Sequence, residues 1–126
     1  KVILVTRDPR SVFSSMKTRK SLSFPGHDVD EFIKWYKLIM KIHCENSFSK
    51  KIKIINYENF ILNNKKEKKK LLKFLGIKED LDNKFNLSKS EKNIFKAKKN
   101  LSKIELKKIS FHLKKYLKWP KFADKI

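Results

Sequence analysis

The hydrophobic positions of this chain follow two patterns, and both occur within its first twenty residues. Residues 2–5 form a continuous apolar run rich in β-branched side chains, which is typical of a strand buried on both faces of a parallel sheet. Asp8 can cap a helix in which Pro9 takes the first position, where its missing N–H costs little. The pattern predicts a strand, a tight turn and a helix over residues 9–20, whose apolar core stripe is Val12, Phe13 and Met16.

The same two patterns predict a second helix, a second strand and a third helix. Asp28 followed by Glu31 resembles a capping box, and the residues after it are apolar at helical spacing. Residues 51–57 are rich in isoleucine and form the strand, which a helical crossover connects in parallel to the first. The helix over residues 64–75 ends at Gly76. We expect the apolar faces to pack in the core: Phe32, Trp35, Tyr36, Ile39, Met40 and His43, then Leu71, Leu72, Phe74 and Leu75.

The pattern in the last third of the chain predicts helices and no strand. Ser88 and Glu91 indicate a short capped helix after a polar loop over residues 78–90. Ser102 and Glu105 form a capping box, flanked by an apolar pair that can act as a hydrophobic staple. The apolar stripe that follows consists of Leu106, Ile109, Leu113, Tyr116 and Leu117. The fold class is therefore α/β, with two parallel strands and four to five helices.

Candidate chemistry gathers where the first strand ends. Open α/β sheets bind ligands at the carboxyl ends of their strands, and Arg7 stands at that position. Its planar guanidinium matches phosphate geometry, and a helix N-terminus offers backbone N–H groups to an anion. Ser11 and Ser15 share one helix face and can donate hydroxyl hydrogen bonds. The structural alternative is a solvated arginine beside ordinary capping serines.

The segment KVILVTRDPRSVFSS resembles the 3′-phosphate-binding segment of the sulfotransferases that use 3′-phosphoadenylyl sulfate. That family shows an apolar strand, then Arg-(Asn/Asp)-Pro-Arg, then a serine eight residues after the first arginine. Here Ser15 stands eight residues after Arg7. The resemblance implies that Arg7 and Ser15 hold the 3′-phosphate of the nucleotide.

A second block carries the same resemblance. The family shows Tyr-Glu-(Asp/Asn)-Leu after a strand and then a helix that ends in Phe-Leu-Gly-Ile; this chain has YENF from Tyr57 and FLGI from Phe74. In several members the matching tyrosine lies near the nucleotide, so the resemblance implies Tyr57 as a third binding residue. The structural alternative is a strand-end aromatic whose hydroxyl bonds the backbone. Glu58 is expected to cap or pair structurally.

The resemblance implies a phosphate-loop-type parallel sheet flanked by helices, in an enzyme that transfers a sulfuryl group from 3′-phosphoadenylyl sulfate to a hydroxyl or amine acceptor without a metal. Only two glycines occur, and neither lies between a strand and a helix, so residues 1–126 contain no Gly-rich phosphate loop. We therefore expect them to form the C-terminal part of one domain, with the phosphate loop and the catalytic base before Lys1. No catalytic residue is assigned, because His27, His43 and His112 suit structural or solvated roles.

The Arg-Lys-Gly triplet that some members of that family use for the 3′-phosphate is absent. Four lysines near the expected place could replace it, and the sequence does not choose among Lys92, Lys96, Lys98 and Lys99.

Charge leaves a second function open. The chain has 33 Lys and Arg against 13 Asp and Glu, a net charge of +20, which suggests an anionic partner. The alternative to a sulfotransferase is a basic module that binds nucleic acid or another polyanion without catalysis. The aromatic residues of the chain occur at spacings typical of a packed core, and the sequence contains no nucleic-acid-binding motif, so no specific nucleic-acid partner is expected. One cysteine favours a reducing, cytoplasmic location, and no apolar run reaches transmembrane length.

Overall fold

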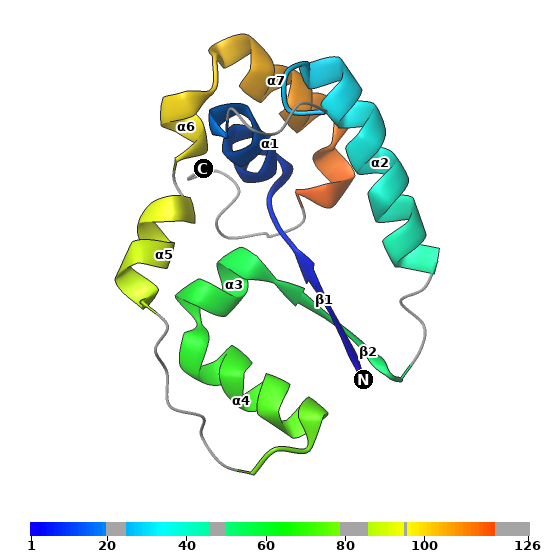
Figure 1. Ribbon diagram of the computed structural model, residues 1–126, viewed down its shortest axis with the longest axis vertical. Coiled ribbons are helices and arrows are strands. Elements are labelled where there is room, and N and C mark those ends of the chain that lie inside the picture. The colour runs from blue at the N-terminus through cyan, green and yellow to red at the C-terminus, as the bar shows by residue number, and fades with distance from the viewer. Residues whose placement is uncertain (20–24, 46–49, 79–85, 95, 118–126) are drawn as a thin grey trace.

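The computed structural model describes residues 1–19, 25–45, 50–78, 86–94 and 96–117. Two parallel strands, β1 (Val2–Thr6) and β2 (Ile52–Asn56), pair so that Val2 lies opposite Ile52 and Thr6 opposite Asn56. In Figure 1 both strands run through the middle of the molecule, and their carboxyl ends meet between α1 and α3. The predicted α/β fold with two parallel strands is confirmed.

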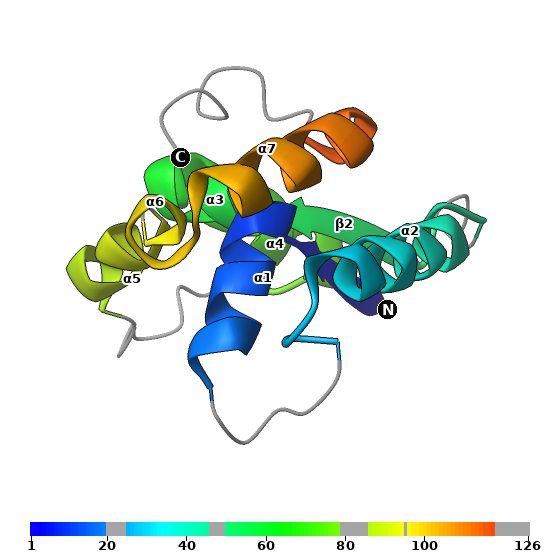
Figure 2. The same cartoon turned by 90° about the horizontal axis from the view of Figure 1, so that it is seen from above.

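The helices enclose the carboxyl end of this sheet. In the described part of the chain they are α1 (Pro9–Thr18), α2 (Val29–Glu45), α3 (Tyr57–Leu62), α4 (Asn64–Leu75), α5 (Leu87–Ile94), α6 (Ala97–Asn100), α7 (Lys103–His112) and a 3₁₀ turn over Lys114–Tyr116. Figure 2 shows α1 in the middle, with α2 on one side, α6 on the other and α7 above it, and α1 packs against all three. The helix that follows β1, α1, is thus the centre of the fold.

The hydrophobic core lies around α1 rather than on the sheet. Phe13 of α1 is fully buried, and its ring centroid lies 4.9 Å from that of Phe32 on α2. The predicted aromatic face of α2 is confirmed at Phe32 and Tyr36, which are buried, while Trp35 and Met40 pack at the margin. The remaining buried apolar residues come from the other helices and the residues that flank them, with none from α4: Ile33, Ile61, Ile94, Ala97, Leu101, Ile109 and Leu113.

Four of the predicted helix caps are present. The Asp8 carboxylate accepts the N–H of Arg10 at 2.8 Å and caps α1, and the predicted Ser102 capping box at the start of α7 is present. Asp28 accepts the N–H groups of Asp30 and Glu31, the second and third residues of α2, at 2.8 and 2.9 Å. Gly76 ends α4 with φ of 80°, a left-handed conformation that favours glycine. Each of these signals depends on neighbouring residues alone.

The prediction that β1 is buried on both faces is wrong. Val2 and Val5 are 50% and 60% exposed, and Ile54 of β2 is 44% exposed. Within the described residues, β1 has β2 as its only sheet neighbour. Because the core is centred on α1, these strands are less buried than their apolar sequence predicts.

The other differences concern short or peripheral helices. Tyr57 does not end the second strand but begins α3, because the side chain of Asn56 accepts the N–H of Asn59 at 2.7 Å and starts a helix. The six-residue α3 and four-residue α6 were not predicted, because they are too short to show a period. The apolar end of α4 is only partly buried, since this helix lies at the edge of the molecule.

Two helix ends in the last third also differ from prediction. At the start of α5, Asn86 rather than Ser88 receives the capping bond, from the N–H of Lys89 at 3.0 Å. The helix α7 ends at His112, and the apolar stripe continues through a 3₁₀ turn instead.

Candidate functional site

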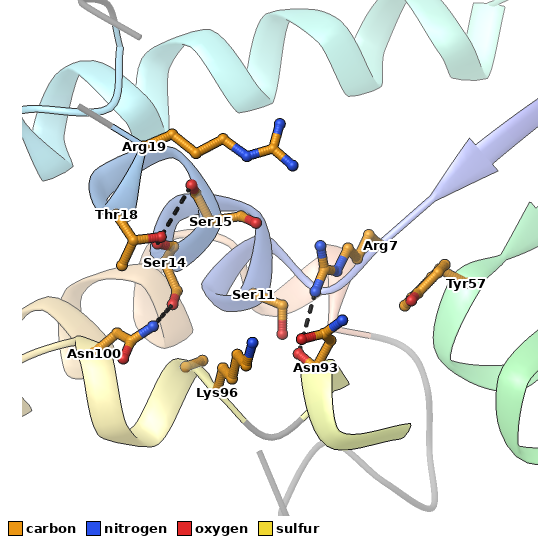
Figure 3. A pocket seen from close by; sticks show the side chains of 11 residues that line it. Arg7, Ser11, Ser14, Ser15, Thr18, Arg19, Tyr57, Asn93, Lys96 and Asn100 are labelled. Carbon is orange, nitrogen blue, oxygen red and sulfur yellow. Dashed lines mark hydrogen bonds between the residues drawn. The ribbon is translucent and has the colours of Figure 1, made fainter. Parts of the chain in front are cut away.

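A pocket of about 410 Å³ opens along the face of α1 that carries its serines. Its wall includes the turn after β1, the start of α3 and residues of α5 and α6, so it lies at the carboxyl end of the sheet. Arg7, Ser15 and Tyr57, the three binding residues suggested by the sequence, all line this one pocket (Figure 3). Among the residues that the structure describes, none that lines this pocket is acidic. Tertiary structure therefore brings the three predicted residues together in a positively charged cavity.

Arg7 is held from several sides. Its backbone carbonyl accepts a hydrogen bond from the buried Tyr36 hydroxyl at 2.8 Å, which fixes the turn after β1. Its Nη2 donates to the carbonyl of Asn93 on α5 at 3.3 Å, and its guanidinium lies 5.0 Å from the centre of the Tyr57 ring. These contacts keep the guanidinium at the pocket wall. Burial and the nearby carboxylates raise the pKa of Tyr36, so its hydroxyl stays protonated and able to donate.

The second arginine of the turn has a different role. The guanidinium of Arg10 binds both oxygens of the Asp8 carboxylate, at 3.0 and 2.7 Å, and both side chains are almost fully buried. Asp8 also accepts the N–H of Arg10. This N–H is therefore not available to a ligand, contrary to the expectation that the helix N-terminus would offer it. Arg10 stabilises the turn and leaves Arg7 to face the pocket.

A buried carboxylate supports Arg7 from behind. Glu58 is 1% exposed; it accepts the N–H of Asp8 at 3.0 Å and the side-chain amide of Asn56 at 2.7 Å. Its carboxylate lies 3.9 Å from Nε of Arg7, too far for a hydrogen bond. Burial raises the pKa of Glu58, and the hydrogen bonds lower it by a smaller amount. Nε of Arg7 is itself buried next to this carboxylate and has no hydrogen-bond partner among the described residues.

The serines of α1 differ in what their hydroxyls do. Ser11 donates to the carbonyl of Ile94 at 3.3 Å, and the hydroxyl of Ser14 accepts from the amide of Asn100 at 3.1 Å. Both serines are buried, and both join α1 to the last helices. The half-buried hydroxyl of Ser15 has no hydrogen-bond partner within the described part of the chain. Ser15 is therefore the α1 serine with a free hydroxyl at the pocket.

Two further cations line this pocket: the sequence did not point to one of them and did not single out the other. Lys96, one of the four candidate lysines, lines it from the turn before α6, and Arg19 lines it from the end of α1 (Figure 3). Arg19 could have been found, because it continues the four-residue spacing of Ser11 and Ser15. No local signal selects Lys96, since it reaches the pocket only through the packing of α6 on α1.

The arrangement is suited to holding an anion and includes no evident general base. His27 and His112 are exposed and line none of the pockets described here, and the side chain of His43 is outside the described residues. Across the described ranges, no cluster of three or more histidine, cysteine or carboxylate side chains could hold a metal ion. None of the helices in those ranges is long and apolar enough to cross a bilayer.

Comparison with known proteins gives one match. A family model described as the sulfotransferase family matches residues 1–81, which include the turn after β1, both strands, α3 and α4. Neither the curated proteins nor the solved structures give a significant match.

Proposed function

Because this chain belongs to the sulfotransferase family, we propose that it is part of an enzyme that uses 3′-phosphoadenylyl sulfate, and that the pocket on α1 binds the 3′-phosphate of that nucleotide. The reaction would move a sulfuryl group from the donor to a hydroxyl or amine of an acceptor. The S–O bond to the donor phosphate breaks, a bond to the acceptor forms, the acceptor loses a proton, and adenosine 3′,5′-bisphosphate leaves.

The observation that carries this proposal is the convergence of Arg7 and Ser15 on one pocket whose described lining residues include no acidic side chain. A phosphate dianion accepts several hydrogen bonds and prefers the fork of an arginine. The guanidinium of Arg7 lines the pocket, and the hydroxyl of Ser15 forms no hydrogen bond within the described residues. Lys96 adds a third donor from another segment. These are the groups a phosphate monoester would require.

In this proposal Tyr57 acts through Arg7. Its ring lies 5.0 Å from the guanidinium carbon, so it limits the rotation of Arg7 and contributes a cation–π contact. Glu58 limits the same side chain from behind. A guanidinium already held in place loses less conformational entropy when the anion binds.

The role of these residues in the reaction is to bind and orient. Binding energy from a part of the substrate that does not react can be used to place the reacting group. A 3′-phosphate site would supply such energy and would favour this nucleotide over ATP, which has no 3′-phosphate. No residue of 1–126 is assigned as the catalytic base, and the phosphosulfate end is proposed to bind outside these residues.

Equilibrium binding of three nucleotides to the full-length protein tests the proposal. Adenosine 3′,5′-bisphosphate should bind about tenfold or more tightly than adenosine 5′-phosphate, because only the former has the second phosphate. Equal affinities would remove the 3′-phosphate assignment. Tighter binding of ATP would instead indicate a phosphate-transferring kinase of related fold.

A further inference from the structure

Helix α7 exposes two large apolar side chains on the side that faces away from the core. Ile109 is its fully buried residue, whereas Ile104 and Phe111 are 70% and 79% exposed, the highest values among the large hydrophobic residues described. Ile104 and Phe111 are seven residues apart, so they lie on one face of the helix, opposite Ile109. Figure 2 shows α7 above α1, at the outside of the molecule. Packing within the described part of the protein therefore does not account for this apolar pair.

Lysines surround the apolar pair. Lys107 lies between the two side chains on the same face, three residues after Ile104 and four before Phe111. Lys103 lies one turn before Lys107, and Lys114 follows the helix in the 3₁₀ turn. All three lysines are exposed, and none forms an ion pair within the described part of the chain. We call Lys103, Ile104, Lys107 and Phe111 the α7 outer face.

The other charged groups of α7 are paired with the neighbouring helices. Glu105, the only acidic residue of α7, pairs with Lys17 of α1 at 2.6 Å and accepts the N–H of Ser102 in the capping box. Lys108 pairs with Asp30 of α2 at 2.7 Å. These ion pairs join α7 to the helices on which it packs. The α7 outer face therefore keeps a positive charge that no carboxylate of its own helix neutralises.

A lipid bilayer with anionic headgroups matches both properties of the α7 outer face. Exposed isoleucine and phenylalanine side chains can enter the boundary between the headgroups and the acyl chains. Lysines beside them can lay their aliphatic stems along the apolar region and reach the headgroups with their ammonium groups. The surface of a membrane that contains anionic lipids attracts such lysines. One partner would thus cover the apolar pair and neutralise the charge around it.

Other partners match only part of this pattern. The centre of a protein interface is depleted in lysine, whereas Lys107 lies at the centre of the α7 outer face. A second copy of this chain, docked by the same face, would bring lysines against lysines, which repel one another. Duplex nucleic acid attracts lysines through its phosphates, but this attraction makes no use of the exposed Ile104 and Phe111.

We propose that the α7 outer face binds the surface of a membrane that contains anionic lipids. Ile104 and Phe111 enter the headgroup boundary, and Lys103 and Lys107 contact the headgroups. The attachment is peripheral and reversible. None of these four residues lines the pocket on α1, so the proposal does not rest on nucleotide binding.

Vesicle binding by the full-length protein tests the apolar pair. The probes are vesicles of phosphatidylcholine alone and vesicles of phosphatidylcholine mixed with phosphatidylserine, each over a series of lipid concentrations. Ile104→Ser with Phe111→Ser changes the α7 outer face. Leu38→Ser with Ile42→Ser makes a matched change on α2, where these side chains are 58% and 44% exposed. Serine has about the same helix propensity as isoleucine and phenylalanine, so α7 should still form.

The parent should bind the vesicles with phosphatidylserine more tightly than those without it, and salt should weaken this binding. The α7 variant should bind them about tenfold or more weakly than the α2 variant, because shallow insertion uses part of the burial energy of each side chain. The α7 variant should melt at the same temperature as the parent, since both side chains are exposed.

A second pair of variants tests the charge. Lys103→Gln with Lys107→Gln removes two lysines from the α7 outer face, and Lys65→Gln with Lys69→Gln makes the same change on α4. All four lysines are exposed and form no ion pair among the described residues. A lysine close to an anionic surface is worth about fivefold in affinity. The α7 pair should therefore weaken binding to phosphatidylserine vesicles about tenfold or more, and the α4 pair should weaken it much less.

Four results would overturn the proposal. One is a parent protein that binds neither kind of vesicle, and another is an equal loss in the α7 and α2 apolar variants. A parent that binds duplex DNA of random sequence but no vesicles would favour nucleic acid as the partner of the lysines. A melting temperature of Ile104→Ser with Phe111→Ser far below that of the parent would show that another part of the protein covers this face.

Discussion

Replacement of Arg7 by alanine is the most direct perturbation of the pocket. The change removes a guanidinium whose Nε has no partner among the described residues and whose Nη2 makes only a 3.3 Å bond to the Asn93 carbonyl. Charge-assisted hydrogen bonds are worth about 1.5–3 kcal/mol. We therefore expect Arg7→Ala to weaken binding of adenosine 3′,5′-bisphosphate by about ten- to a hundredfold. Isothermal titration of the full-length protein measures this directly.

The same substitution should have a small effect on stability. Arg7 is 26% exposed and lies 3.9 Å from Glu58, which keeps its hydrogen bonds to Asp8 and Asn56 when the guanidinium is lost. The cost should be about 1 kcal/mol, below that of breaking a fully buried pair. Arg10→Ala is the contrasting variant, because it leaves the buried Asp8 carboxylate without its cation. It should reduce stability much more than Arg7→Ala does.

Two controls separate charge from geometry. Arg7→Lys keeps the positive charge but loses the planar fork, so its loss of affinity should be smaller than that of Arg7→Ala and still measurable. Adenosine 5′-phosphate should bind equally to parent and Arg7→Ala, because it lacks the 3′-phosphate. If Arg7→Ala folds normally and binds the bisphosphate as tightly as the parent, the 3′-phosphate assignment is refuted.

Three further predictions concern the serines, the buried carboxylate and the end of α4. Ser15→Ala should weaken bisphosphate binding about tenfold, since the anion loses a hydroxyl that forms no hydrogen bond within the described residues. Ser14→Ala should lower the unfolding free energy by about 1 kcal/mol and leave binding unchanged, because the Ser14 hydroxyl accepts from the amide of Asn100 and is almost fully buried. Equal binding losses would contradict this division. Burial raises the pKa of Glu58 above 4.5, so the folded protein binds that proton more readily than the unfolded chain, and the contribution of Glu58 to stability should fall as pH rises from about 4.5 through the folded pKa. Denaturant unfolding of the parent and of Glu58→Gln across this pH range measures how their difference in unfolding free energy changes with pH. A difference that does not change with pH would refute the predicted fall. Gly76→Ala should cost about 1 kcal/mol because φ is 80° there, and Gly76→Asn should cost less; thermal melts that rank the two variants in the opposite order would count against a left-handed cap.

The sequence alone could identify only some of the residues of the site. Local geometry predicted that Arg7, Ser11 and Ser15 lie near one another, because the strand, the turn and the helix between them are continuous in the chain. The resemblance to the sulfotransferases then singled out Arg7 and Ser15. Arg19 lies on the same helix at the same spacing and could have been found in this way. Lys96 could not be chosen over Lys92, Lys98 or Lys99, because its place depends on α6 packing against α1.

The sequence by itself determined the elements whose causes are local: the cap at Asp8, the capping box at Ser102, the left-handed end at Gly76 and the two strands. Tertiary structure alone decided which serine keeps a free hydroxyl, because the partners of Ser11 and Ser14 lie more than eighty residues away in the chain. It also decided how far the apolar strands are covered. Hydrogen bonds and burial at these positions depend on which distant segments pack together, and no residue pattern within one segment records that.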